Sequence, residues 1–138
     1  HDEEPKVRSI YREAHPGWPE RSPLWYFAHP TLVMQADGAL LGFTSYSIGQ
    51  DDRGLVMYGQ DVAVLPRFQH QGYGRQLADE RLRYGRDVGC MRFLGATQPD
   101  NGPMRAILER QGFTELPLRV PNVFPHGTDA ILVGGEIA

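Results

Sequence analysis

Hydrophobic residues recur with helical spacing in three segments of the chain. The first segment, residues 2–15, carries an apolar stripe at spacings i, i+3, i+4 and i+7, and Pro16 follows it. The second segment, residues 75–89, and the third, from Pro103 to a stop at Gly112, each present one apolar face. The apolar residues are Val7, Ile10, Tyr11 and Ala14, then Leu77, Ala78, Leu82, Gly85 and Val88, and finally Met104, Ile107 and Leu108. These patterns predict three helices.

Segments rich in β-branched and aromatic residues predict strands. The predicted strands are residues 31–36, 39–48, 55–65, 91–97, 113–120 and 128–137. Asp37-Gly38 is a strong hairpin-turn signal, and the turn-rich run 49–54 follows the second strand, so we expect the first three strands to form an antiparallel meander. Residues 16–30 combine prolines with aromatic side chains and are not expected to form one long helix.

The order of these elements is α, β-β-β, α, β, α, β-β, which defines a mixed α/β domain. The strand–loop–helix–strand unit around residues 60–97 implies a parallel strand pair with a right-handed crossover. A chain of 138 residues fits one compact domain, residues 1–138.

The amino-acid composition and net charge exclude several classes of binding partner. The net charge of −3 leaves no basic surface field for a nucleic acid, and no apolar run reaches the length of a membrane-spanning helix. The single cysteine, Cys90, excludes an intrachain disulfide framework. No signal peptide is visible, so we expect a cytoplasmic protein with no nucleic-acid or membrane partner and no metal site.

A glycine-containing loop, Gln69 to Gly74, lies between a predicted strand and a predicted helix. Gly72 and Gly74 lack Cβ atoms, so the backbone can turn sharply and approach a ligand closely. The N–H groups of the loop and of the first helical turn, together with the helix dipole, form a site for phosphate oxygens. The alternative is a tight connection that binds nothing.

Two common phosphate-binding loops do not fit this segment. A P-loop requires Gly-Lys-Ser/Thr, and neither Lys nor Ser/Thr follows Gly74. The dinucleotide fingerprint requires Gly or Ala at the position of Leu77 and an acidic residue about twenty residues further on, near Gly95, and the sequence has neither.

The loop and its flanks resemble the GCN5-related N-acetyltransferase (GNAT) superfamily. The pattern Gln69-x-x-Gly72-x-Gly74 is similar to the pyrophosphate loop of that family. The other matching phrases are Asp61-Val-Ala-Val-Leu-Pro66, Asn101, Ala106-Ile107-Leu108 and Gln111-Gly112-Phe113. The resemblance implies a mostly antiparallel central sheet flanked by helices, in which parallel strands 55–65 and 91–97 splay apart.

The resemblance also implies acetyl-coenzyme A as co-substrate. Its pyrophosphate would lie on the loop formed by Gln69, His70, Gln71, Gly72, Tyr73, Gly74 and Arg75. The pantetheine arm would add to the edge of Val62, Ala63 and Val64, and the Val62 N–H would stabilise the oxyanion of the thioester. Asn101 would face the arm, cap a helix, or do both.

Tyr58 and Asp61 are the candidates for moving the proton of an attacking amine. Strict alternation would place Tyr58, Gln60, Val62 and Val64 on one strand face and Gly59, Asp61 and Ala63 on the other. Asp61 would act as the base or as a structural hydrogen-bond acceptor, and Tyr58 would relay a proton or pack in the core. Leu108 occupies the position of a family Tyr that protonates the leaving thiolate, so no general acid is assigned.

The acceptor pocket of the family is shaped by segments that correspond here to residues 16–30 and 119–128. Its candidate residues are Trp18, Trp25, Tyr26, Phe124 and His126, each of which could instead pack in the core or face solvent. We expect transfer of an acetyl group to a primary amine of a small molecule or peptide by direct attack. The alternatives are a non-catalytic acyl-coenzyme A-binding regulatory or scaffolding module and an interaction domain.

The start of the chain differs from the family pattern. The family normally has a strand before its first helix, whereas this sequence begins with the predicted helix of residues 2–15, so the first family strand is expected to be missing. The strand that begins near Thr31 would then have a free edge, or an edge covered by a partner chain or by residues absent from this sequence. Such an edge invites pairing, which suggests a homodimer.

Overall fold

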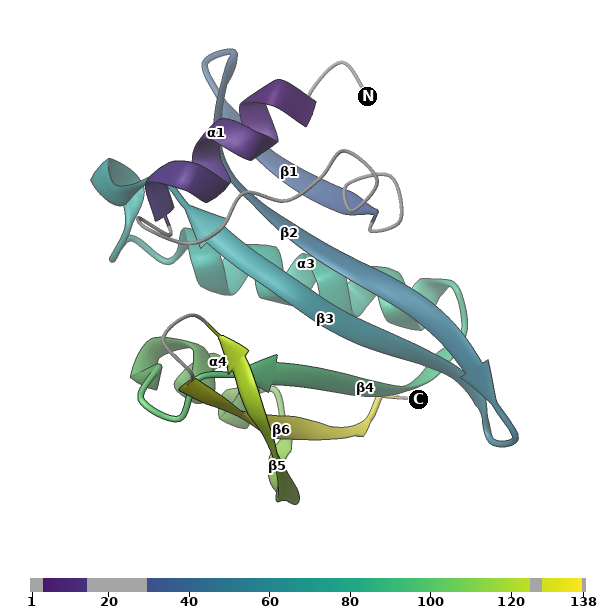
Figure 1. Ribbon diagram of the computed structural model, residues 1–138. Helices are drawn as coiled ribbons and strands as arrows, with labels where there is room; N and C mark the ends of the chain where they lie inside the picture. Colours follow the sequence, from purple (N-terminus) through teal and green to yellow (C-terminus); the bar gives the residue numbers. More distant parts are fainter. Residues whose placement is uncertain (1–3, 15–29, 125–127, 138) are drawn as a thin grey trace. The chain divides into compact units, whose positions relative to one another are not determined.

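A computed structural model describes residues 4–14, 30–124 and 128–137 (Figure 1). The helices are α1 (Glu4–Ala14), the 3₁₀ turn η1 (Pro66–Phe68), α3 (Tyr73–Asp87) and α4 (Gly102–Arg110). The strands are β1 (Thr31–Ala36), β2 (Ala39–Asp51), β3 (Gly54–Val64), β4 (Cys90–Thr97), β5 (Thr114–Phe124) and β6 (Thr128–Glu136). They form one sheet in the order β1-β2-β3-β4-β6-β5. Because β3 and β4 are parallel, the predicted mixed α/β fold with its crossover is confirmed.

The chain divides into two compact units. The first unit comprises His1–Ser47 and Asp61–Arg81, and the second comprises Ile48–Gln60 and Leu82–Ala138. The glycine loop and the last residues of β3 belong to the first unit. The parallel pairing of β3 with β4 belongs to the second.

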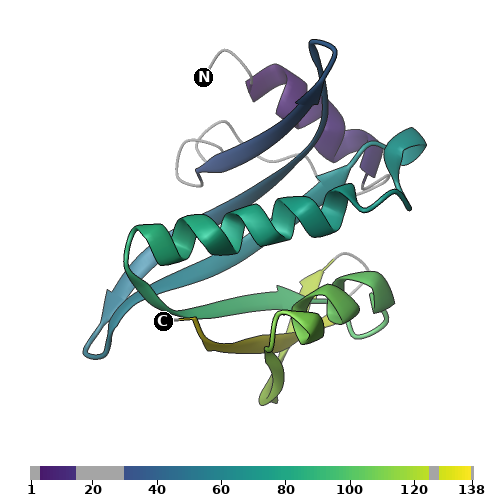
Figure 2. The ribbon, with the colours of Figure 1, turned by 180° about the vertical axis from the view of Figure 1, so that it is seen from behind.

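In the first unit, helices pack on both faces of β2 (Figures 1 and 2). The predicted stripe of α1 forms one apolar cluster with residues of β2, β3 and the segment after it. The buried members are Val7, Ile10, Tyr11, Leu40, Phe43, Ala63 and Leu65. On the opposite face, a Cβ on Gly42 would stand 3.2 Å from Leu77 Cδ1 of α3. Alternation along β2 therefore sends Phe43 toward α1 and leaves the Gly42 side open to α3.

The turn between β1 and β2 confirms the Asp37-Gly38 prediction. Asp37 has φ 51° and Gly38 has φ 79°. Two consecutive positive φ values define the type I′ geometry, whose twist matches the twist of the flanking strands. β1 stands at one end of the strand order, as expected for the strand that begins at Thr31. Pairing of β1 with a second copy stays a prediction.

In the second unit, β4 is an inner strand of the sheet. It pairs in parallel with β3 and antiparallel with β6, which in turn pairs with β5. Phe93 of β4 stacks on Phe113, with ring centroids 4.9 Å apart. Asn101 caps α4 as predicted, because its side-chain oxygen accepts from Met104 N–H at 3.2 Å.

Three predicted boundaries and one predicted core residue were wrong. β5 continues to Phe124, four residues beyond its expected end at Val120. β2 continues to Asp51 and leaves only Asp52-Arg53 as the turn, because Gly49 lies flat against Tyr58, where a Cβ would stand 3.1 Å from the ring. α3 begins at Tyr73, two residues earlier than expected. Val88 is 39% exposed instead of inward-facing, because α3 ends at Asp87 and the chain turns at Gly89.

The strict alternation expected along β3 was also wrong. Met57 lies against Gly85 of α3, and Val62 lies against Gly74 of the same helix. Met57 and Val62 are five residues apart, so regular alternation would send them to opposite faces of the sheet. The side-chain direction therefore changes between them, and Tyr58 does not share a face with Val62. Such an interruption bends a strand and redirects its backbone groups.

Candidate functional site

The glycine loop is anchored to the end of β3. Leu65 N–H donates to Leu41 O at 2.9 Å, which holds the chain against β2 as it leaves the strand. The Gln69 side chain turns back, and its Nε2 donates to Val64 O at 2.9 Å. The Gln69 side-chain amide therefore ties the loop to the strand. The contact of Gln69 with the cofactor stays a prediction.

The loop then turns into α3 through two residues with positive φ, His70 at 64° and Gly72 at 87°. A Cβ at Gly72 would meet no atom within 4 Å, so the loop is open on that side. Gln76 N–H donates to Gly72 O at 3.0 Å as the first turn closes. The N–H groups of residues 73–75 precede this bond, so no helical carbonyl is available to them.

The loop carries positive charge and no carboxylate. The sequence has no Asp or Glu from Val62 to Ala78, whereas Arg67, His70 and Arg75 are all exposed there. Arg67 stacks over Phe68, and its guanidinium is 3.8 Å from Glu13. The N-terminus of α3 adds the positive end of a helix dipole. Backbone donors, open space and the exposed positive charge of Arg75 fit the pyrophosphate of a nucleotide ligand.

The segment of β3 that leads into this loop can offer backbone groups to a ligand. The register of β3 with β4 covers Leu55 to Gly59 and ends there within the described part of the chain. Val62 is half-buried, whereas Ala63 and Val64 are buried. A strand that extends past its partner presents free N–H and C=O groups, which is the geometry that an added amide chain uses.

Asp61 lies in a buried polar cluster with Ser45, Thr44 and Arg81. Ser45 Oγ donates to Asp61 Oδ2 at 3.3 Å and accepts from Asp61 N–H at 3.2 Å. Thr44 Oγ1 donates to Asp61 O at 2.6 Å. These contacts support the structural role considered for Asp61, and its role as a base stays a prediction.

Thr44, Ser45 and Arg81 were missed by the sequence reasoning. Arg81 is only 3% exposed, and its Nη1 donates to Thr44 Oγ1 at 3.2 Å. Its position was a usable signal, because residue 81 falls on the same helical face as Leu77 and Ala78. An arginine on the apolar face of a helix is an exception that calls for a polar partner.

The remaining predicted residues belong to the second unit or lie outside the described residues. Tyr58 is half-buried in β3, and Asn101 caps α4. Leu108 is buried, so this position offers no hydroxyl. The acceptor-pocket candidates outside the described residues are Trp18, Trp25, Tyr26 and His126. Phe124 ends β5, and its side chain is likewise not described.

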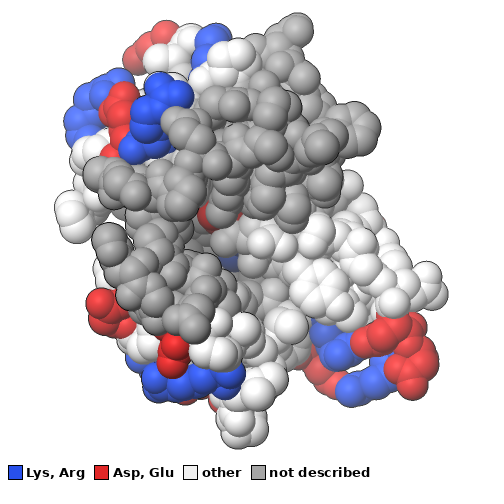
Figure 3. Space-filling model, in the orientation of Figure 1, with Lys and Arg blue, Asp and Glu red and all other residues white. Residues whose placement is uncertain are grey.

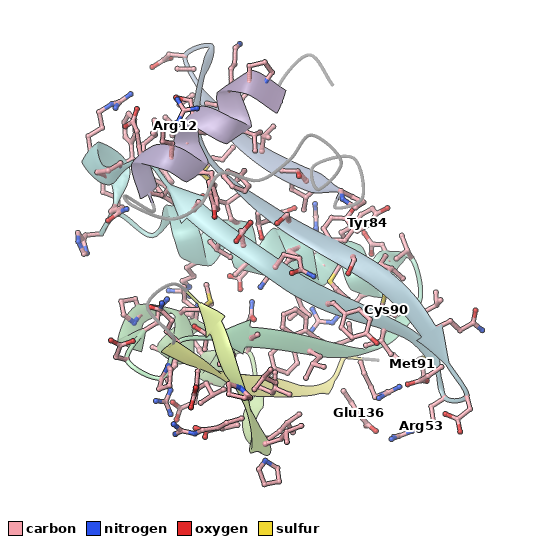
Figure 4. The ribbon with its side chains drawn as sticks, in the orientation of Figure 1. Arg12, Arg53, Tyr84, Cys90, Met91 and Glu136 are labelled. Carbon is pink, nitrogen blue, oxygen red and sulfur yellow. The ribbon has the colours of Figure 1, made fainter. Side chains whose placement is uncertain are left out.

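The tip of the β2–β3 hairpin in the second unit carries a mixed charge cluster (Figures 3 and 4). Arg92 is hydrogen-bonded to Asp51, and this bond lowers the pKa of the Asp51 carboxyl. Arg53 lies 3.8 Å from Glu136. A shallow pocket here is lined by Arg53, Met91, Arg92 and Glu136, and it contains none of the predicted cofactor residues. The charged side chains that line this pocket are paired with charges of opposite sign, so we interpret the cluster as structural.

Comparisons with known proteins agree with this geometry. Residues 4–113 match the family model described as Acetyltransferase (GNAT) family, and the chain belongs to that family. It is therefore an acetyltransferase that uses acetyl-coenzyme A, as the loop motif predicted. Among curated proteins, the comparison finds no match.

Solved structures share the fold at low sequence identity. The ribosomal-protein-S18-alanine N-acetyltransferase of Escherichia coli is 21% identical, with a TM-score of 0.82 over 97% of this chain and 87% of its own. The putative acetyltransferase yncA of Salmonella typhimurium, solved with its cofactor acetyl-CoA, is 20% identical, with a TM-score of 0.79 over 99% and 90%. The ribosomal-protein-alanine N-acetyltransferase of Brucella melitensis is 19% identical, with a TM-score of 0.80 over 98% and 94%.

Two further features are absent from the residues that the structure describes. No helix in these ranges is long and apolar enough to cross a membrane. No group of three or more His, Cys, Asp or Glu residues in them is placed to hold a metal ion.

Proposed function

We propose that this protein transfers the acetyl group of acetyl-coenzyme A to a primary amine by direct attack. The open, carboxylate-free loop at the start of α3 is the observation that carries the proposal. The N–H groups of residues 73–75, with Gly72 held open by its positive φ, bind the pyrophosphate. Gln69 holds the loop in place through Val64 O, and Arg75 adds an exposed positive charge.

The segment from Val62 to Val64 holds the pantetheine arm by strand-like hydrogen bonds. The Val62 N–H points at the thioester oxygen and stabilises the negative charge that develops there. The amine nitrogen forms the new C–N bond, the C–S bond breaks, and coenzyme A leaves as its thiolate, which takes a proton from water. The proton lost by the amine reaches solvent through Asp61 or Tyr58, with water between. Asn101 contributes to the cofactor site in addition to capping α4.

The binding step is tested with a matched pair, Gly72→Asp and Gly72→Asn. Asp and Asn have nearly the same shape, and both tolerate positive φ, so the two variants should unfold at similar temperatures. Only Asp places a negative charge beside the pyrophosphate. Calorimetry should show coenzyme A binding at least about tenfold weaker for Gly72→Asp than for Gly72→Asn, since like charges a few ångström apart repel by kcal/mol. Equal affinities would place the pyrophosphate elsewhere.

The transfer step is tested by thiol release from acetyl-coenzyme A across a panel of acceptors. The panel includes small primary amines, peptides with a free α-amino group, among them one that begins with alanine, and peptides with a lysine side chain. An N-terminally blocked, lysine-free peptide is the control. Product mass should increase by one acetyl group on nitrogen. Tight binding of acetyl-coenzyme A with no thiol release from any amine would favour the acyl-coenzyme A-binding module instead.

A further inference from the structure

A chain of buried hydrogen bonds links α3 to the backbone of β3 beside Val62. Arg81 Nη1 donates to Thr44 Oγ1 at 3.2 Å, and Thr44 Oγ1 donates to Asp61 O at 2.6 Å. The directions are fixed by chemistry, because a guanidinium only donates and a carbonyl oxygen only accepts. The Thr44 hydroxyl must therefore accept from Arg81 and give its single proton to Asp61 O.

This last bond acts on the peptide group that contains the Val62 N–H. Asp61 C=O and Val62 N–H belong to the same planar trans peptide, so they point in opposite directions. Holding Asp61 O toward β2 therefore directs the Val62 N–H away from β2.

The same bonds also strengthen the N–H as a donor. A hydrogen bond to the oxygen of an amide withdraws electron density from its nitrogen, and linked hydrogen bonds polarise one another. The chain begins at a full positive charge, since the pKa of Arg81, lowered to about 10 by burial, leaves the group protonated at neutral pH. Asp61 carries the balancing charge, and its carboxylate is held by Ser45.

We propose that Thr44 and Arg81 are positioning residues for the acetyl transfer. They aim and polarise the Val62 N–H, so that it stabilises the thioester oxyanion more strongly than an isolated amide would. This inference rests on the proposed function, in which the Val62 N–H is the oxyanion donor. It assigns a reaction-related role to two residues that touch neither the cofactor nor the acceptor.

The proposal is tested with Thr44→Val, Thr44→Ser and Arg81→Met. Thr44→Val keeps the shape and removes the hydroxyl, Thr44→Ser keeps the hydroxyl, and Arg81→Met removes both the charge and the N–H donors that start the chain. Val7→Ala is the control, because it creates a packing defect in the apolar cluster that includes Ala63 of β3 and removes none of the hydrogen bonds of the chain. Thermal unfolding of each variant measures its stability.

The primary measurement is the carbonyl stretch of bound acetyl-coenzyme A labelled with ¹³C at the thioester carbon. Polarisation by an N–H lowers this frequency relative to free acetyl-coenzyme A. We expect the shift to be largely lost in Thr44→Val, reduced in Arg81→Met, and retained in Thr44→Ser and Val7→Ala. With an active amine, kcat should fall about tenfold in Thr44→Val with little change in cofactor affinity, less than the full loss of an oxyanion donor costs.

The outcomes separate this proposal from the proposed function. No frequency shift in the unaltered protein would remove Val62 as the oxyanion donor and the relay with it. A normal shift in the unaltered protein that persists in Thr44→Val, or in Arg81→Met if Thr44→Val does not fold, would overturn the relay alone. An equal loss in Val7→Ala would show that the effect follows stability and would also overturn it.

Discussion

Two glycines in the same loop should respond in opposite ways to the same substitution. Gly72 has φ 87°, a region that costs an L-residue about 1–2 kcal/mol. Gly74 lies in the first turn of α3, where a Cβ would make ordinary contacts at 3.7 Å with Val62 Cγ1 and 4.0 Å with Val64 Cγ2. Alanine at either position restricts the unfolded chain, which by itself stabilises by about 0.4–1 kcal/mol.

The difference between the variants isolates the backbone strain, because the effect on the unfolded chain is common to both. Gly72→Ala should lower the free energy of unfolding by about 0.5–1 kcal/mol, and Gly74→Ala should raise it by a similar amount. At this chain length about 2–4 °C of Tm corresponds to each kcal/mol, so the two melting temperatures should differ by about 2–8 °C.

Coenzyme A binding provides the second measurement on the same pair. The Cβ of Gly72→Ala enters the open space where the pyrophosphate is proposed to lie, whereas that of Gly74→Ala packs onto β3. Calorimetry should therefore show weaker binding only for Gly72→Ala. Equal melting temperatures would refute the strain argument. Equal binding with unequal melting temperatures would refute the proposed position of the ligand.

Three further predictions concern other parts of the chain. Gly42→Ala should lower the free energy of unfolding in denaturant by about 1–3 kcal/mol, because its Cβ would stand 2.6 Å from Ala63 O. Gly102→Ala, whose Cβ would enter open space, should not lower it. Equal stability of the two variants would contradict the packing of β2 on β3. Asn101→Ala should lose about 1 kcal/mol of stability and Asn101→Ser little, because Ser also caps a helix. If Asn101 also binds the cofactor, as proposed, both variants should bind coenzyme A more weakly. Unchanged binding in both variants would mean that Asn101 acts only as the helix cap. The pKa of the buried Cys90 thiol is raised by desolvation, so its reaction with an aromatic disulfide at pH 8 should be much slower in the native protein than in urea, and equal rates would mean that Cys90 is accessible.

Local signals accounted for most of the element boundaries. The Asp37-Gly38 turn, the Asn101 cap and the stops at Gly89 and Gly112 each act within a few residues, and the structure places all of them as expected. The loop motif from Gln69 to Gly74 could be recognised in the sequence for the same reason, because its glycine spacing reflects one local turn and the start of one helix. What the motif left open was the task of each residue, such as the inward bond of Gln69.

The non-local features required the fold. Strict alternation places Tyr58 on the wrong face, and no pattern within β3 indicates that its Asp61 backbone bonds to Ser45 and Thr44 of β2, sixteen and seventeen residues away. The turn after β2 was predicted too long because the packing of Gly49 on Tyr58 is a contact between strands. The sequence places Arg81 on the apolar face of its helix, but only the folded chain brings the Thr44 hydroxyl within reach to accept its hydrogen bond.

The amino-acid sequence by itself determined the helices, most strands, the glycine loop and the family to which the chain belongs, because turns, caps and glycine spacing are short-range effects. The tertiary structure alone decided which side chains are hydrogen-bonded to the peptide group that contains the predicted oxyanion donor. Hydrogen bonds between residues 44, 61 and 81 join three elements, and no periodicity within one element encodes the distances between them.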